Sequence, residues 1–292
     1  MLEKGEKIES FISLKDEALI NELTGEYNLG IQLSSDFVTF CILDYEKKKF
    51  IFLETYQFSG ESNMAFSCEY VKRIVLSNQL LQSNFKNIFI SYVNQKSTLI
   101  PYPLYSENHK ADYYKINHTI EKGVTLHTDK MQVLEAINIY ALSEDVDKAM
   151  LKLFPTAKTN HFSSILIDYF LLRYRNNSQK VAIIHVQLST FEILIVNGKN
   201  LNFYNSFLIK TPEDFVYYIL FVFEQLKIDA NSIELILCGQ IIRNSELYLL
   251  LFNYVKNIRF EERDNSFQYS YVFEEIPNHF YSNIFHQFKC VS

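Results

Sequence analysis

The sequence contains few of the residues that interrupt secondary structure. Among 292 residues there are 7 Gly and 5 Pro, against 20 Tyr and 25 Phe. Few Gly and Pro predict short connections, and the many aromatic rings supply material for packing. Because 48% of the residues are hydrophobic, the chain can fill a sizeable core, which excludes a disordered protein. The length fits one large domain or two small ones.

Cysteine is also scarce. The four cysteines are scattered, and no two of them form a Cys-x-x-Cys pair or lie at ligand spacing from a histidine. This pattern favours reduced thiols that are buried as small hydrophobic groups in a reducing compartment, over disulfides or zinc ligands. The residues are Cys41, Cys68, Cys238 and Cys290.

The chain has no excess of positive charge and no long apolar run. Its net charge of −6 and its pI of about 5.7 argue against a nucleic-acid partner, which normally meets a basic surface. The longest apolar run, Phe215 to Phe223, is roughly half the length of a membrane-spanning helix. Met1 to Ser10 is charged and lacks the apolar core of a signal peptide. We therefore expect a cytoplasmic protein without a membrane span.

The second half of the sequence follows a β-β-β-α-β-α pattern. Three runs rich in hydrophobic residues predict a meander, in which Asn197-Gly198 is a two-residue hairpin turn. Thr211-Pro212-Glu213-Asp214 predicts a helix start, with Thr as the N-cap and acids beside the positive end of the helix dipole. The predicted strands are 180–188, 191–196, 201–209 and 233–238, and the predicted helices are 212–226 and 245–255.

The first half repeats this order and shares two short motifs with the second. Strands are predicted at 29–33, 37–43, 50–58 and 88–93, and a helix within 64–81. Each half opens on a similar strand, Ile31-Gln32-Leu33-Ser34-Ser35 and Val186-Gln187-Leu188-Ser189-Thr190. Each also has a helix opened by Asn-His-Phe, at 160–162 and 278–280. The shared order indicates a duplication, with a first unit at 1–176 that has an insertion near 97–142, and a second unit at 177–292.

Four stretches resemble an uncharacterised bacterial family, a domain of unknown function that is placed among the actin-like ATPases. They are 27–35, 98–101, 237–241 and 276–279. The resemblance implies an α/β fold with two ribonuclease H-like units in the actin-like ATPase arrangement. In active members of that superfamily, the first strand of each unit carries Asp-x-Gly. The Asp holds magnesium or its waters, and the Gly lets backbone amides reach phosphate.

The sequence departs from this pattern in both units. Gln32 and Gln187 stand where the resemblance places Asp, and a neutral amide is a poor partner for a hard divalent cation. Ser34 and Ser189 stand where it places Gly, and a Cβ there costs about 1–2 kcal/mol if the loop is left-handed. A paired-glycine turn is reduced to Cys238-Gly239.

A degenerate nucleotide cleft without catalytic residues or metal ligands is therefore expected. Its candidate residues are Gln32, Ser34, Ser35, Gln187, Ser189, Thr190, Cys238 and Gly239.

Three other features have a structural and a functional interpretation. His161 and His279 head matched helices and could face each other to bind an anion or a metal, but capping and packing are favoured. His185 shares a strand face with Gln187, and a core histidine is the favoured interpretation. The helix from Asp214 to Leu226 is apolar on nearly every face, so any exposed side would present an aromatic patch typical of a protein interface.

These observations favour a pseudo-ATPase that serves as a non-catalytic scaffold or partner-binding component, with another protein as its partner and at most weak ATP binding. The alternative is a nucleotide-binding ATPase or small-molecule phosphotransferase that uses the inter-unit cleft and takes its acid from Asp36, Asp168 or Glu192. Binding of a small anion or metabolite between the units is a third hypothesis. A cleft filled by side chains would mean a scaffold.

Overall fold

The computed structural model describes residues 10–58 and 64–289, so Cys290 and most of the charged N-terminal segment lie outside the described residues. The first half of the chain builds a sheet of order β1-β4-β3-β2-β5-β9, and β15 pairs with β4. Strands β2, β3 and β4 are antiparallel, whereas β5 and β9 run parallel to β2. The strands are β1 Ile12–Lys15, β2 Tyr27–Leu33, β3 Phe37–Asp44, β4 Lys49–Gln57, β5 Asn87–Tyr92, β9 Lys158–His161 and β15 Gln268–Tyr269.

The second sheet repeats this arrangement, with order β12-β11-β10-β13-β14. Its first three strands in sequence are antiparallel, and β13 and β14 extend it in parallel from β10. All predicted strands are present in the two sheets, with ends within two residues of those predicted. The strands are β10 Lys180–Val186, β11 Thr190–Asn197, β12 Asn200–Leu208, β13 Glu234–Gly239 and β14 Ile258–Phe260.

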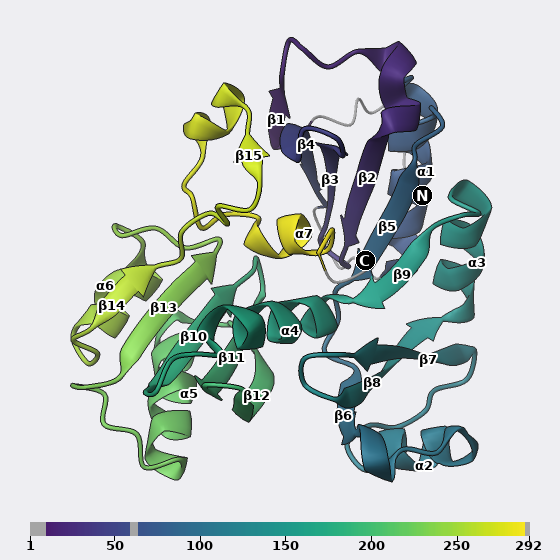
Figure 1. The fold of residues 1–292 in the computed structure, drawn as a ribbon. Coiled ribbons are helices and arrows are strands. Elements are labelled where there is room, and N and C mark those ends of the chain that lie inside the picture. The colour runs from purple at the N-terminus through teal and green to yellow at the C-terminus, as the bar shows by residue number, and fades with distance from the viewer. Residues whose placement is uncertain (1–9, 59–63, 290–292) are drawn as a thin grey trace.

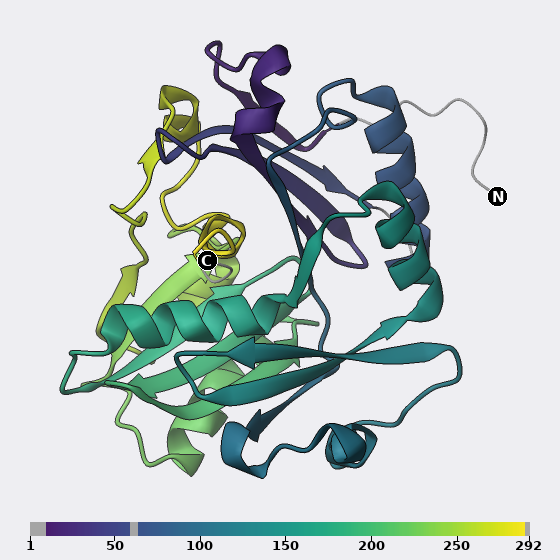
Figure 2. The ribbon, with the colours of Figure 1, turned by 45° about the vertical axis from the view of Figure 1, so that its right-hand side comes forward.

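Helices cover both sheets, as Figures 1 and 2 show. The predicted helix α1 (Met64–Ser77) and helix α3 (Glu144–Leu153) pack on one face of the first sheet. The predicted helices α5 (Pro212–Gln225) and α6 (Glu246–Phe252) pack on one face of the second. Helix α5 begins with a capping box, because Thr211 and Asp214 exchange side-chain and backbone hydrogen bonds.

The opposite faces of the sheets are covered by exchanged helices. Helix α4 (Phe162–Tyr174) belongs to the first half of the sequence but packs on the second sheet. The short α7 (Ser282–His286) and the 3-10 helix η4 (Tyr271–Glu275) belong to the second half but pack on the first sheet. The predicted boundary between the two units, at 176 and 177, therefore does not coincide with a division between the two hydrophobic cores. The assignment of two units stays a prediction.

The predicted insertion forms a sheet of its own, of order β6-β8-β7, with helix α2 (Lys110–Lys115) packed against it. The segment 124–142, predicted to be strand-like, is a pair of strands joined by a turn. This sheet lies below the first sheet in Figure 1. Its strands are β6 Ser97–Pro101, β7 Val124–Met131 and β8 Ala136–Ser143, and three further 3-10 helices are η1 Asn21–Glu26, η2 Tyr102–Leu104 and η3 Glu107–His109.

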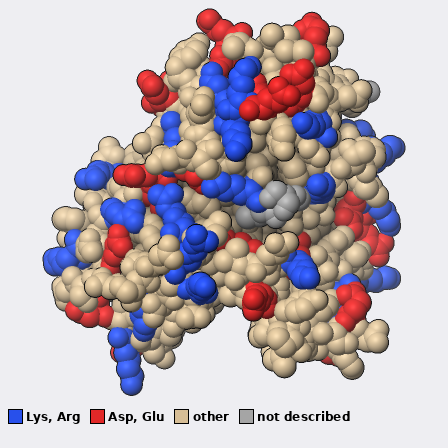
Figure 3. Space-filling model, viewed as in Figure 1, with Lys and Arg blue, Asp and Glu red and all other residues tan. Residues whose placement is uncertain are grey.

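Burial and surface charge agree with a packed α/β protein. Cys41, Cys68 and Cys238 are free thiols, and all three are buried, as predicted. On the face shown in Figure 3, Lys and Arg are interspersed with Asp and Glu. Within residues 10–58 and 64–289, no helix has both the length and the apolar character that crossing a membrane requires.

Candidate functional site

Two equivalent turns form the floor of the cleft between the sheets. The turn between β2 and β3 is closed by the backbone of Ser34, whose N–H donates to Phe37 O at 2.9 Å. The turn between β10 and β11 is closed in the same way by Gln187, whose N–H donates to Thr190 O at 2.8 Å. Each turn therefore has two central residues and joins two antiparallel strands of its sheet.

The strand register pairs different residues from those suggested by the shared sequence motif. Gln32 lies opposite Thr39, and His185 occupies the same place in the second hairpin, opposite Glu192. Gln32 is thus equivalent to His185, and aligning it with Gln187 is wrong by two residues. Because side chains alternate with a period of two, this shift keeps every residue on its correct face and is hidden in the sequence pattern.

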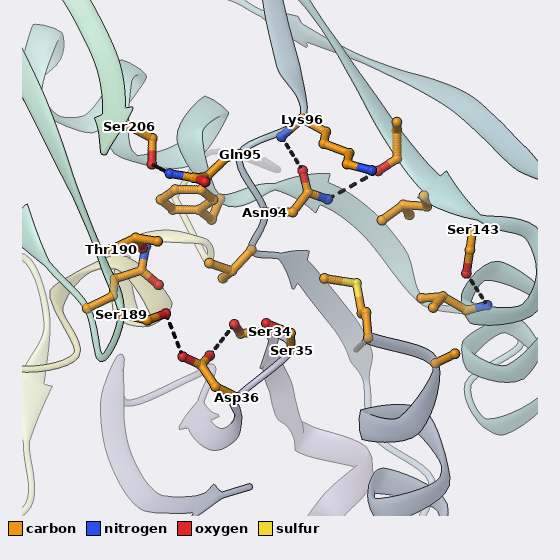
Figure 4. Close-up of a pocket in the computed structure, with 18 of the residues that line it drawn as sticks. Ser34, Ser35, Asp36, Asn94, Gln95, Lys96, Ser143, Ser189, Thr190 and Ser206 are labelled. Atoms are coloured by element: carbon orange, nitrogen blue, oxygen red, sulfur yellow. Dashed lines mark hydrogen bonds between the residues drawn. The ribbon is translucent and has the colours of Figure 1, made fainter. Parts of the chain in front are cut away.

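A cavity of about 540 Å³ lies above these turns, between them and the insertion. Five of the predicted site residues line it: Ser34, Ser35, Gln187, Ser189 and Thr190. Figure 4 shows four of these five at the cavity. Its other walls include the segment after β5, part of β8 and the start of α3, which the sequence reasoning had not linked to the cleft. Residues of α1, α4, β11 and β12 also contribute to the lining.

The other three predicted site residues lie outside this cavity. Gln32 and Gly239 line a separate space of about 30 Å³, which is large enough for a water molecule. Cys238 is fully buried in β13. Gly239 has φ +81°, and a Cβ there would overlap the carbonyl of Val186. The packing supports the structural interpretation of this glycine, as a tight turn against β10.

Asp36 joins the two turns across the cleft. Ser34 Oγ donates to Asp36 Oδ1 at 2.5 Å, and Ser189 Oγ donates to Asp36 Oδ2 at 2.9 Å (Figure 4). One carboxylate therefore accepts a hydrogen bond from each hairpin turn. We call this arrangement of Ser34, Asp36 and Ser189 the Asp36 clasp. The sequence reasoning named Asp36 only as a substitute acid, since a contact across 153 residues leaves no local pattern.

A second carboxylate, Glu192, also lines the cavity and is buried from bulk solvent. It accepts hydrogen bonds from His185 Nδ1 at 2.9 Å, from Gln187 Nε2 at 3.2 Å and from Ser206 Oγ at 3.1 Å. These donors compensate the burial of the carboxylate. His185 is thus a hydrogen-bonded core histidine, as favoured from the sequence. Gln95 in turn donates to Ser206 at 3.2 Å, which links the segment after β5 to β12.

The third predicted acid, Asp168, serves a different purpose. It does not line the cavity, and its carboxylate accepts from the backbone N–H groups of Gln132 and Leu134 at 3.1 and 3.2 Å. Burial raises the pKa of Asp168. The residue therefore orders the turn between β7 and β8. Of the three acids suggested from the sequence, Asp36 and Glu192 line the cavity.

The cavity has more negative than positive side chains. Among its described lining residues, the carboxylates are Asp36, Glu121, Asp145 and Glu192, and the one cation is Lys96. Lys96 Nζ lies 2.6 Å from Glu121, so this pair neutralises itself. No group of three or more His, Cys, Asp or Glu in the described part of the chain could hold a metal ion. The cleft is thus acidic but offers no built metal site.

The histidines of the two Asn-His-Phe motifs contact equivalent backbone carbonyls. His161 Nε2 lies 3.0 Å from Asn94 O, and His279 Nε2 lies 2.6 Å from Ile241 O. Both carbonyls lie two residues beyond a parallel strand, β5 or β13. Because a carbonyl only accepts, Nε2 carries the proton in each ring.

His161 also caps a helix. Its Nδ1 accepts from the backbone N–H of Ser163 at the start of α4. Burial lowers the pKa of His161 to about 3 and also lowers that of His279. These contacts support the capping and packing interpretation for His161 and packing for His279. The motif at 278–280 does not itself open a helix, because α7 begins at Ser282 with Tyr281 as its N-cap.

Two sheets of the same strand order, with exchanged helices and a cleft between paired hairpins, define the actin-like ATPase fold. A Bacteroides thetaiotaomicron protein with actin-like ATPase fold and unknown function superposes with a TM-score of 0.74 and 20% identity, over 83% of this chain and 93% of that one. A chain of the PilM-PilN type IV pilus biogenesis complex superposes with a TM-score of 0.61 and 10% identity, over 91% and 98%. The fold predicted from the sequence is confirmed.

The chain belongs to the family described as "Protein of unknown function (DUF3822)", whose model matches residues 16–258. The resemblance noted in the sequence is therefore confirmed at the level of the family. A search of the curated proteins gives no match.

Proposed function

We propose that this chain is a non-catalytic pseudo-ATPase that acts by binding, as a scaffold or partner-binding component. The Asp36 clasp carries the proposal. Its carboxylate lies between the two turns that, by resemblance to working ATPases, would cradle phosphate. Two unit charges 4 Å apart near a protein surface repel by about 4 kcal/mol, so the carboxylate opposes a phosphate at this place.

The turns themselves also lack the features that phosphate binding uses. The backbone N–H groups of Ser34 and Gln187 close the turns. The side chain of Ser34 is hydrogen-bonded to Asp36, and that of Gln187 to Glu192. Glu192 has donors on both of its oxygens and is poorly placed to hold a magnesium ion. Catalysis of phosphoryl transfer depends on positioned cations and donors around the phosphate, which this floor does not offer.

An exposed aromatic patch supports a protein partner. Tyr217 and Phe221 lie on the outer side of α5, 60% and 43% exposed, and their rings stack at 6.0 Å. Leu249 and Phe252 of the neighbouring α6 are exposed as well. Aromatic side chains of this kind are enriched at protein interfaces. Among the solved structures of this fold, PilM forms a complex with a protein, PilN.

The test is phosphate release from Mg-ATP by the purified chain. We expect no release above that of buffer at any protein concentration. Release that rises with protein concentration and persists through a second purification step would contradict the proposal.

The second candidate function, an ATPase or small-molecule phosphotransferase, is favoured by the open cleft. A cavity of about 540 Å³ lies within the usual range for ligand sites, and it is not filled by side chains. In that case Asp36 or Glu192 would supply the acid, and Asp36→Asn would lower turnover roughly 10²- to 10⁴-fold. A non-catalytic chain has no turnover to lose, so the same variant separates the two functions.

A further inference from the structure

The cavity contains carboxylates without a cationic partner. Of its four lining carboxylates, Glu121 is paired with Lys96. Asp36 and Asp145 form no ion pair with a Lys or Arg of the described residues, and the clasp hydroxyls on Asp36 are neutral donors. A charged carboxylate in a partly enclosed site favours a cation beside it. An anionic small molecule is thus disfavoured there.

Gln187 adds an independent sign of a missing donor. The residue is 6% exposed and lines both this cavity and the separate space of about 30 Å³. Its amide nitrogen donates to both oxygens of Glu192 at 3.2 Å, which fixes the orientation of the amide group. The amide oxygen has no donor among the described residues. Buried acceptors in folded proteins nearly always have a partner, so this oxygen calls for an N–H or O–H from a ligand or a water molecule.

Apolar side chains form part of the remaining walls. Val93, Leu142, Val146, Phe162 and Leu208 line the cavity together with the polar floor. Such a site suits a molecule with a polar head and an apolar body, because burial of apolar ligand surface against the apolar walls is energetically favourable.

We propose that the cleft binds a small organic cation, a primary ammonium or guanidinium group with an apolar body. Its N–H groups donate to the Asp36 carboxylate and to the Gln187 amide oxygen, and its body lies against the walls that include Val93 and Phe162. The proposal rests on the proposed function, which leaves the cleft free of nucleotide phosphates.

The experiment compares three probes of similar shape on the full chain by calorimetric titration: 2-phenylethylamine, 2-phenylethanol and 3-phenylpropionate. We expect the amine to bind about tenfold or more tightly than the alcohol, because hydrogen bonds to a charged group are the stronger ones. The carboxylate probe is expected to bind more weakly than either. Equal binding of amine and alcohol, or no binding of the amine, would overturn the proposal.

A variant pair locates the site. Asp36→Asn removes the charge and is expected to weaken the amine about tenfold, with little effect on the alcohol. The matched control is Asp112→Asn, on the surface of α2, with no effect on either probe. An equal loss for amine and alcohol in Asp36→Asn would contradict a charge-based contact. The three-probe comparison on the unaltered chain stands even if the variant folds poorly.

A parallel titration with Mg-ATP separates this proposal from the proposed function. Failure of the amine to bind, with no binding of Mg-ATP, overturns the organic-cation ligand and leaves a non-catalytic protein. Binding of Mg-ATP with release of phosphate overturns both.

Discussion

The Asp36 carboxylate receives one hydroxyl hydrogen bond from each of the two hairpin turns, at 2.5 Å from Ser34 and 2.9 Å from Ser189. Such bonds to a charged acceptor are shorter and stronger than those between neutral groups. The contact is partly exposed, so water competes for it. At this residue the two halves of the molecule are joined directly across the cleft.

Replacement of Ser189 by Ala tests this contact. We expect the free energy of unfolding to fall by about 1 kcal/mol, because one hydrogen bond to a carboxylate is lost in a partly solvated place. Urea unfolding measures the change, and Ser178→Ala, at an exposed position, is the control with a change under about 0.5 kcal/mol. No difference between the two variants would show that the clasp does not contribute to stability.

His161 makes stability depend on pH. Its folded pKa is about 3, compared with an ordinary value of 6.5, because burial opposes the charged ring. Below about pH 6.5 the ring gains a proton in the unfolded chain but not in the folded one. The contribution of the neutral His161 ring to the free energy of unfolding is therefore fully present at neutral pH and is lost as the pH falls from 6.5 towards 3. Asp129 acts in the opposite direction below pH 6, since burial raises its pKa to about 6.

A variant isolates the histidine from Asp129. We expect His161→Gln to be less stable than the unaltered chain at pH 7.5, and the difference to close by about 2 kcal/mol at pH 5, at about 1.4 kcal/mol per pH unit. Urea unfolding at the two pH values measures it, with the exposed His109→Gln as the control. A difference in the free energy of unfolding that stays constant with pH would show that burial does not lower the pKa of His161.

At the residue scale, the sequence predicted part of the site. The strand-end motifs contain Ser34, Ser189 and Thr190, which do line the cavity. The motifs also suggested Gln32 as the partner of Gln187, because a shift of two residues preserves the alternation of faces. The clasp depends on a contact between Asp36 and Ser189, which lie 153 residues apart, and no local pattern records that contact.

At the scale of elements, Gly239 ends β13 in a backbone conformation that side chains rarely adopt. We expect Gly239→Ala to lower the free energy of unfolding by roughly 3 kcal/mol, from left-handed strain and overlap with Val186 O. The matched control is Gly25→Ala, where no atom lies within 4 Å of a Cβ and a change under about 0.5 kcal/mol is expected. Equal stability of the two variants, measured by urea unfolding, would contradict the strained turn.

Elements with strong local signals were predictable. The start of helix α5 is marked by the capping residues Thr211 and Asp214, and the central strands are continuous apolar runs. The edge strands β1 and β15 were not predicted, because they exist through pairing with β4 rather than through their own pattern. Helix α3 was also missed, although Ser143 as N-cap and three acids in its first turn give a readable signal.

At the scale of the whole molecule, the order of elements predicted the fold class, because β-β-β-α-β-α used twice fits few architectures. The exchange of α4 and α7 between the sheets was not predictable, since both helices are apolar enough to pack on either sheet. This exchange ties the two halves together around the cleft, so that the Asp36 clasp and the cavity are formed by both. Whether the halves arose by duplication stays a prediction.

The most direct measurement of the central claim is thermal unfolding of the chain with and without Mg-ATP at millimolar concentration. A clasp that opposes phosphate predicts no rise in the unfolding temperature. Micromolar binding would instead stabilise the folded chain by about 4 kcal/mol at that concentration. A stabilisation of this size, together with release of phosphate, would contradict a non-catalytic role.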